Sequence, residues 1–270
     1  MAYAYLLNID MRIKNHVSNG CSFSTKKTYL SAHQKLGQQL ELSDTVMLAK
    51  GGRGNERITT TTQTWFYRNP ERLRDTFVSI GWSSAHRWDY VHQLNTEEQV
   101  KRGLPGIKKA VADFSYQWGS WRSWEQDFFL KDPDLHIEHT AAVKTLTSIL
   151  TLQNFFQLHS VPYVFYWALS NDLPDEPDIN VLKNQVDQTH FYNFNPAPAI
   201  KNNLQSMFSW FTKTTKQIVL DNTDYCQSHF EYCVKNNCTK SAIDGHPTQQ
   251  GHHAWANLIY NFVNEKKIIK

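Results

Sequence analysis

Stretches typical of buried β-strands alternate with stretches of helical periodicity, and this alternation constrains the fold of the chain more than any other feature. The strand-like stretches are mostly rich in Val, Ile and aromatic residues, and they cover residues 16–19, 45–49, 76–80, 161–168 and 217–220. Helical patterns cover residues 28–40, 138–158 and 248–264. Parallel strands need crossover connections, which are usually helices. The sequence therefore predicts an α/β fold, a three-layer α/β/α sandwich of the flavodoxin-like kind with a central parallel sheet.

Two stretches interrupt this alternation, and we interpret both as insertions in one domain that spans residues 1–270. The first, at about 92–134, contains Trp118, Trp121 and Trp124, and the second lies at about 171–198. A chain of 270 residues can bury a sizeable core, and one domain with insertions fits this length better than two equal domains. The tryptophan cluster is either ordinary core or a binding surface.

Composition argues against two classes of partner. The formal net charge is +3, and the Lys and Arg residues are scattered rather than gathered in a stripe, which argues against nucleic acid as a partner. No run approaches the roughly 20 apolar residues that a membrane helix needs. The first residues show neither a basic leader nor a cleavage site, so the sequence predicts a cytoplasmic protein without a membrane partner.

Four cysteines bear on the redox state and on metal binding. Cys21 stands alone, while Cys226, Cys233 and Cys238 cluster with His229. An odd cluster in a chain without a secretion signal indicates free thiols rather than a disulfide framework. The cluster reads C-x2-H-x3-C-x4-C and could hold zinc, but its spacing matches no common zinc module. We therefore expect free thiols, no metal and no cofactor.

A serine follows the first predicted strand within the sequence NGCSFS of residues 19–24. Gly20 allows a sharp turn at the strand end, after which Ser22 stands at the start of a helix, beside free backbone N–H groups. Such surroundings suit a nucleophilic serine and its oxyanion. Alternatively, Ser22 or Ser24 only caps the helix.

Further polar residues follow the second and third predicted strands. Three glycines lie among residues 51–54, which suits either a close backbone approach to an anion or carbonyl, or a plain turn before a helix. Asn55 is then either the helix cap or a side-chain donor into a site. Ser83 follows the third strand, with Arg87 shortly after. In parallel sheets such strand ends are where ligands bind.

A fourth segment, Asp244-Gly245-His246-Pro247, precedes the last predicted helix. An Asp two residues from a His, in a turn with Gly and Pro, can place both side chains over one strand end. The His can then act as general base on a serine, with the Asp orienting its ring. An exposed surface loop is the other interpretation.

In order, these segments resemble the blocks of the SGNH (GDSL-type) hydrolase superfamily. That family has a Gly-x-Ser block after strand one, a Gly block after strand two, a Gly-x-Asn block after strand three and a late Asp-x-x-His-Pro block. The matching residues are Gly20-Cys21-Ser22, Gly54, Gly81-Trp82-Ser83 and Asp244-Gly245-His246-Pro247. The resemblance extends from about residue 19 to 256 outside the insertions. The variant is similar to SGNH-like proteins of bacteriophages and environmental microbes, which implies a location in a host cytoplasm or virion.

The resemblance implies a serine hydrolase that cleaves an O-acetyl or related acyl ester, on a small molecule or a glycan. Ser22 is the implied nucleophile, His246 the general base and Asp244 its support. The backbone N–H groups of Ser22 and Gly54 are the implied oxyanion donors. Further oxyanion or substrate-binding residues are expected to be Asn55, Ser83 and Arg87.

Three positions depart from the family pattern. Cys21 replaces the usual Asp, Asp244 and His246 stand one residue closer together, and Ser83 replaces the Asn that donates to the oxyanion. Losing one such donor typically lowers the rate about 100- to 1000-fold. Ser83 or Asn55 is expected to donate in its place. The alternative function is a weak or inactive SGNH-like scaffold that binds a glycan or protein partner through its aromatic insertion.

Overall fold

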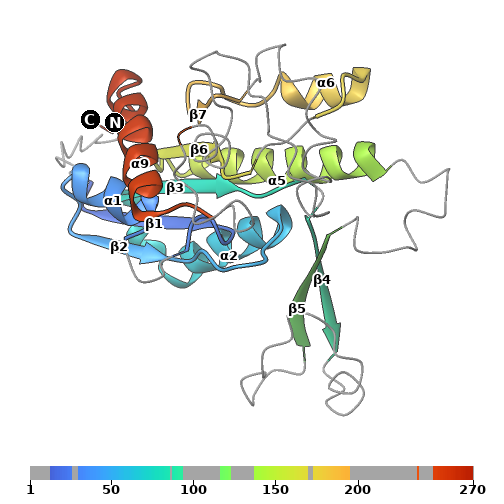
Figure 1. Cartoon of the computed structure of the whole chain (residues 1–270), viewed down its shortest axis with the longest axis horizontal. Coiled ribbons are helices and arrows are strands. Elements are labelled where there is room, and N and C mark those ends of the chain that lie inside the picture. Colours follow the sequence, from blue (N-terminus) through green and yellow to red (C-terminus); the bar gives the residue numbers. More distant parts are fainter. Residues whose placement is uncertain are drawn as a thin grey trace, which may run out of the picture.

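Five parallel strands form the central sheet of the computed structural model, which describes residues 13–25, 30–85, 87–93, 116–122, 137–169, 173–194, 236 and 246–269 (Figure 1). The strand order is β2-β1-β3-β6-β7, an order typical of flavodoxin-like sheets. The strands are β1 (Asn15–Gly20), β2 (Asp44–Met47), β3 (Thr76–Trp82), β6 (Tyr163–Trp167) and β7 (Phe191–Tyr192). The predicted parallel sheet is confirmed; the strand expected at 217–220 lies outside the described residues.

Helices cover both faces of the sheet, which confirms the three-layer α/β/α architecture (Figure 1). One core lies between the sheet and the helices α2 (Asn55–Arg68) and α5 (Ile137–Leu158). A second core lies between the opposite face and the helices α1 (Ala32–Gln39) and α9 (Gln249–Glu265). A short 3-10 helix, η1 (Pro70–Arg74), leads into β3. Since both faces are covered, β3 and β6 are apolar along much of their length, whereas β1 buries mostly polar residues.

Side-chain caps explain where α1 and α9 begin. Ser31 accepts a hydrogen bond from the Gln34 N–H, and the Gln34 side chain accepts one from the Ser31 N–H, which completes a capping box. The described helix α1 therefore starts at Ala32, after the start expected from periodicity. Thr248 caps α9 by accepting from the Gly251 N–H at 3.3 Å.

The described parts of both predicted insertions contain regular structure. The strands β4 (Arg87–Gln93) and β5 (Tyr116–Arg122) form a separate antiparallel pair that extends away from the central sheet in Figure 1. The second insertion contributes α6 (Pro177–Lys183) and the edge strand β7. The side chains of Trp118, Trp121 and Trp124 lie outside the description.

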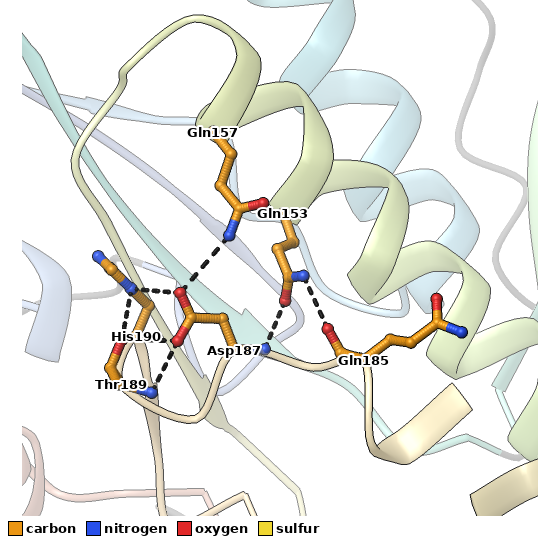
Figure 2. A network of polar contacts seen from close by, with 6 residues as sticks. All are labelled: Gln153, Gln157, Gln185, Asp187, Thr189 and His190. Carbon is orange, nitrogen blue, oxygen red and sulfur yellow. Dashed lines mark hydrogen bonds and ion pairs between the residues drawn. The ribbon is translucent and has the colours of Figure 1, made fainter. Parts of the chain in front are cut away.

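A polar network ties the segment before β7 to α5 (Figure 2). The Gln153 side chain donates to the Gln185 carbonyl at 2.9 Å and accepts from the Asp187 N–H at 2.7 Å. The Asp187 carboxylate in turn accepts from the Thr189 N–H at 2.9 Å and lies 2.8 Å from His190 Nδ1. Because the Gln153 side chain bonds to two backbone groups, the segment that leads into β7 is fixed in position relative to α5.

No helix in the described part of the chain is long and apolar enough to cross a membrane.

The α5 side of the core offers a direct test of the layer assignment. Leu146 is fully buried on α5, whereas Leu158 at the end of the same helix is 79% exposed. We expect Leu146→Ala to lower the free energy of unfolding by about 2–5 kcal/mol, because it leaves a cavity between helix and sheet. Leu158→Ala, the matched control, should change it by less than about 0.5 kcal/mol. Urea unfolding of both variants checks this, and equal effects would contradict the assignment.

Candidate active site

The residues predicted to form a site follow the carboxyl ends of neighbouring parallel strands. Ser22 follows β1, the loop of residues 51–54 follows β2, and Ser83 follows β3. In the sheet, β1 lies between β2 and β3. These three segments therefore lie together at the carboxyl ends of the strands, where open α/β sheets bind their ligands.

Ser22 lies in a tight turn that depends on Gly20. The Ser24 N–H donates to the Cys21 carbonyl at 3.0 Å, which closes the turn. A Cβ on Gly20 would collide with the Ser24 hydroxyl and lie 2.8 Å from the Gly81 carbonyl oxygen. Ser22 is half-buried, and its hydroxyl and N–H make no hydrogen bond to any described residue, His246 included. Both groups can therefore interact with a substrate.

The loop of residues 51–54 lies beside Ser22. A Cβ added to Gly51 would lie 3.7 Å from the Ser22 Cβ. The loop ends at Gly54, which is the N-cap residue of α2. A Cβ on Gly54 would collide with the Arg87 carbonyl oxygen, so the close approach of β4 requires glycine at this position.

The Gly54 N–H, one of the two oxyanion donors expected from the sequence, already has an acceptor. It donates to Asp89 Oδ1 at 3.1 Å, and the Arg57 N–H donates to Asp89 Oδ2 at 2.9 Å. Asp89 comes from β4, so a carboxylate of the hairpin occupies the positive end of the α2 dipole. Sequence reasoning missed Asp89, which stands inside a strand rather than after one.

Asn55 connects the second and third strand ends. Its side-chain amide donates to the Ser83 carbonyl at 3.2 Å and to Thr145 Oγ1 of α5 at 3.1 Å. Its carbonyl oxygen accepts from the Ser83 N–H at 2.8 Å. Both amide hydrogens are therefore engaged, and Asn55 positions the Ser83 backbone while its own donors point to protein groups. Ser83 is fully buried, and the Arg87 N–H donates to the Ser84 carbonyl at 3.1 Å.

His246 lies next to the Ser22 turn, although more than two hundred residues separate them in the chain. Its ring stacks on Phe23, with ring centroids 4.9 Å apart and an interplanar angle of 21°. The start of α9 is also tied to α1, because His252 Nδ1 accepts from the Ala32 N–H at 3.2 Å. Asp244 lies outside the described residues. The roles of Ser22, His246 and Asp244 thus stay predictions.

Asn19 is a further residue that sequence reasoning missed. It is fully buried at the end of β1, and its amide group donates to the Ile58 carbonyl at 3.0 Å and to the hydroxyls of Thr61 and Thr62 at 2.8 and 2.9 Å. Its carbonyl oxygen accepts from the Gly20 N–H at 2.8 Å. The only sequence signal was an Asn directly before a glycine at a strand end.

A buried polar network underlies the Ser22 turn on the α1 side of the sheet. Ser79 Oγ lies 2.7 Å from His16 Nε2 and 2.5 Å from His33 Nδ1. His33 Nε2 lies 3.0 Å from the Tyr166 hydroxyl, and the Tyr166 ring packs beside Ser24 over Gly81. Since Ser79 has one hydroxyl hydrogen, it donates to one imidazole and accepts from the other.

Burial keeps both of these histidines neutral. It lowers the pKa of His16 to about 3. The pKa of His33 is also well below its usual value, because of burial and then of the nearby His16 and His252. A protonated imidazole in this core would leave a buried charge without a carboxylate among the described neighbours.

His139 forms the one group among the described residues whose side chains could together hold a metal ion. Its Nδ1 lies 2.5 Å from Glu176 Oε2, and its Nε2 lies 3.1 Å from Asp178 Oδ2. The hydrogen bond to Glu176 raises the pKa of His139. With a carboxylate at each ring nitrogen, the group suits a protonated His139 whose ion pairs join α5 to the start of α6. The cysteine cluster with Cys226, His229, Cys233 and Cys238 lies outside the described residues, whereas Cys21 is a buried free thiol.

Twelve chains among the solved structures are similar to this protein, and two of them serve as examples. A psychrotrophic esterase from Pseudoalteromonas sp., inhibited by monoethylphosphonate, has 7% identity and a TM-score of 0.40 over 93% of this chain and 97% of that one. A protein described provisionally as an acylhydrolase, from Bacteroides fragilis, has 11% identity and a TM-score of 0.37 over 95% of this chain and 88% of that one. Neither a protein-family model nor a curated protein sequence matches the chain.

The buried histidines predict a loss of stability in acid. The unfolded chain binds protons at His16 below pH 6.5, whereas folded His16 binds its proton only near pH 3. Stability is therefore complete above pH 6.5 and falls as the pH decreases, by about 1.4 kcal/mol per pH unit for each such histidine. Urea unfolding between pH 7 and 4 measures the slope. His16→Asn should reduce it by about that amount, and an unchanged slope would show that His16 titrates normally.

Proposed function

We propose that the protein is a serine hydrolase that cleaves an O-acetyl or related acyl ester, on a small molecule or a glycan. The observation that supports this most is the stack of the His246 ring on Phe23, the residue that directly follows Ser22. A hydroxyl with no partner among the described residues and an imidazole beside the same turn are the parts of a nucleophile and its general base.

In the proposed reaction Ser22 Oγ attacks the ester carbonyl carbon while His246 accepts the serine proton. The tetrahedral intermediate then collapses, His246 protonates the leaving alcohol, and an acyl-enzyme on Ser22 remains. Water, activated by His246, releases the acid and restores Ser22. Asp244 orients the imidazole and stabilises its protonated form. No metal or cofactor takes part in this scheme.

The proposed site has fewer free oxyanion donors among the described residues than a complete SGNH site. The Ser22 N–H is available among the described residues, but the Gly54 N–H is bonded to Asp89, and the Asn55 amide is bonded to Ser83 and Thr145. Each missing donor lowers the rate about 100- to 1000-fold. We therefore expect a slow enzyme.

Labelling by a fluorophosphonate probe tests the nucleophile. The wild-type protein should form a stable adduct at Ser22, identified by mass spectrometry of the peptide, because phosphonylation needs only an activated serine and its base. Ser22→Ala should abolish labelling, and His246→Asn should slow it at least about 100-fold. Ser43→Ala is the control, because Ser43 is an exposed serine that directly precedes β2, at the amino end of that strand. A wild-type protein that neither reacts nor hydrolyses acetyl esters would exclude this function.

The same experiment addresses a second candidate, an inactive SGNH-like scaffold that binds a glycan or protein partner. The engaged Gly54 N–H favours this candidate, because a carboxylate sits where an oxyanion would bind. In that case the probe leaves the protein unlabelled, and glycan-array binding survives Ser22→Ala while Trp121→Ala removes it.

A further inference from the structure

Two arginines lie at the start of α2, and the strand that begins with a third packs against the same loop, next to the strand ends that carry Ser22. We call Arg53, Arg57 and Arg87 the arginine cluster. Arg53 belongs to the loop beside Ser22, Arg57 to the first turn of α2, and Arg87 begins β4. The Arg87 carbonyl approaches Gly54 so closely that a Cβ there would collide with it, which brings β4 against this loop. The proposed reaction leaves Arg53 and Arg57 without a role.

Nitrogen atoms of the arginine cluster are withdrawn from water. Arg53 is only 6% exposed, and its Nη1 donates to Asn19 Oδ1 at 3.3 Å and to Thr61 Oγ1 at 3.0 Å. Its Nε is buried and meets no acceptor among the described residues. Arg87 Nη1 is likewise buried with no acceptor in the described part of the chain. Desolvated guanidinium hydrogens are costly unless an acceptor is bound.

Asp89 is the carboxylate that interacts electrostatically with both Arg53 and Arg57, but its two oxygens also accept the N–H groups of Gly54 and Arg57. Glu56, the acidic residue in the first turn of α2, pairs with Lys144 at 3.4 Å. The charge of Asp89 is therefore shared between two guanidinium groups and the positive end of the helix dipole. Burial and the neighbouring Arg57 lower the pKa of Arg53 to about 10, so Arg53 remains charged at neutral pH.

Positive charge next to a proposed nucleophile is typical of anion recognition, for which the planar guanidinium fork is well suited.

We propose that the arginine cluster binds a negatively charged group, such as a carboxylate, on the ester that Ser22 cleaves, so that the protein prefers anionic esters to neutral ones. This substrate class rests on the proposed hydrolase function. The anion replaces the missing acceptors of Arg53 and Arg87, and it places the ester at the strand ends beside Ser22. A charge-assisted, partly desolvated contact of this kind favours the charged substrate about 10- to 100-fold.

Two pairs of closely matched esters test this preference. The acetyl esters of 4-hydroxybenzoate and 4-hydroxybenzamide differ in charge on the alcohol side. Mono-4-nitrophenyl adipate and 4-nitrophenyl heptanoate differ in charge on the acyl side. For each ester kcat/KM is divided by its rate of hydrolysis by hydroxide. The wild-type protein should prefer the anionic member of at least one pair about 10- to 100-fold, and equal values in both pairs would overturn the proposal.

Arginine variants assign the preference to the cluster. We expect Arg57→Gln and Arg87→Gln each to reduce the anionic-to-neutral ratio about tenfold. Arg68→Gln, at the opposite and exposed end of the same helix α2, is the matched control and should keep the ratio. Melting temperatures of the variants show that each is folded. A ratio that neither cluster variant changes would locate the preference elsewhere and refute the assignment.

Calorimetric titration separates this proposal from the proposed function. The probes are 4-hydroxybenzoate against 4-hydroxybenzamide, and adipate against adipamide, none of which is a substrate. If the protein hydrolyses no ester but binds a carboxylate selectively, and Arg57→Gln and Arg87→Gln remove that binding, the hydrolase function fails and the anion site stands. Hydrolysis without any charge preference leaves the function standing and removes the anion site. Absence of both hydrolysis and selective binding overturns both.

Discussion

The end of β1 is held in place by the buried side chain of Asn19, and the candidate site depends on this attachment. One amide group reaches three acceptors on α2, while its carbonyl oxygen accepts from the next residue, Gly20. A central strand buried on both faces offers no water to such a group, so its hydrogen bonds must be made within the protein. These bonds set the point at which the chain leaves the sheet and turns toward Ser22.

The hairpin carboxylate Asp89 has a comparable role on the other side of the site. By accepting from two N–H groups at the start of α2, it fixes the glycine loop next to Ser22 and joins strand β4 of the hairpin to the main body. The same contact competes with the oxyanion expected at Gly54. Asp89 thus fixes the loop beside Ser22 and, by occupying the Gly54 N–H, limits the rate of the proposed hydrolysis. It also provides a negative charge next to the arginine cluster.

A buried polar network lies among the apolar side chains on the α1 side of the sheet. His16, Ser79 and His33 form a continuous hydrogen-bonded series beneath the Ser22 turn, and burial keeps the imidazoles neutral. Such a network requires each donor to find its acceptor, so alternative packings of the layer are disfavoured more strongly than in an apolar core. The Ser22 turn therefore packs on a hydrogen-bonded layer that has one favoured arrangement.

The sequence alone determined the layered α/β class and the order of the polar segments, because periodicity and glycine position are local properties of the chain. It also indicated that segments around Ser22 and His246 would meet, and the stack of His246 on Phe23 agrees with that. Only the tertiary structure decided that the Gly54 N–H is bonded to Asp89, that the Asn55 amide is bonded to the Ser83 carbonyl, and that Arg53 and Arg57 share Asp89 at the start of α2. Each of these outcomes is a choice among hydrogen-bond or charge partners tens of residues apart, and no local pattern records which partner the folded chain brings within hydrogen-bonding distance.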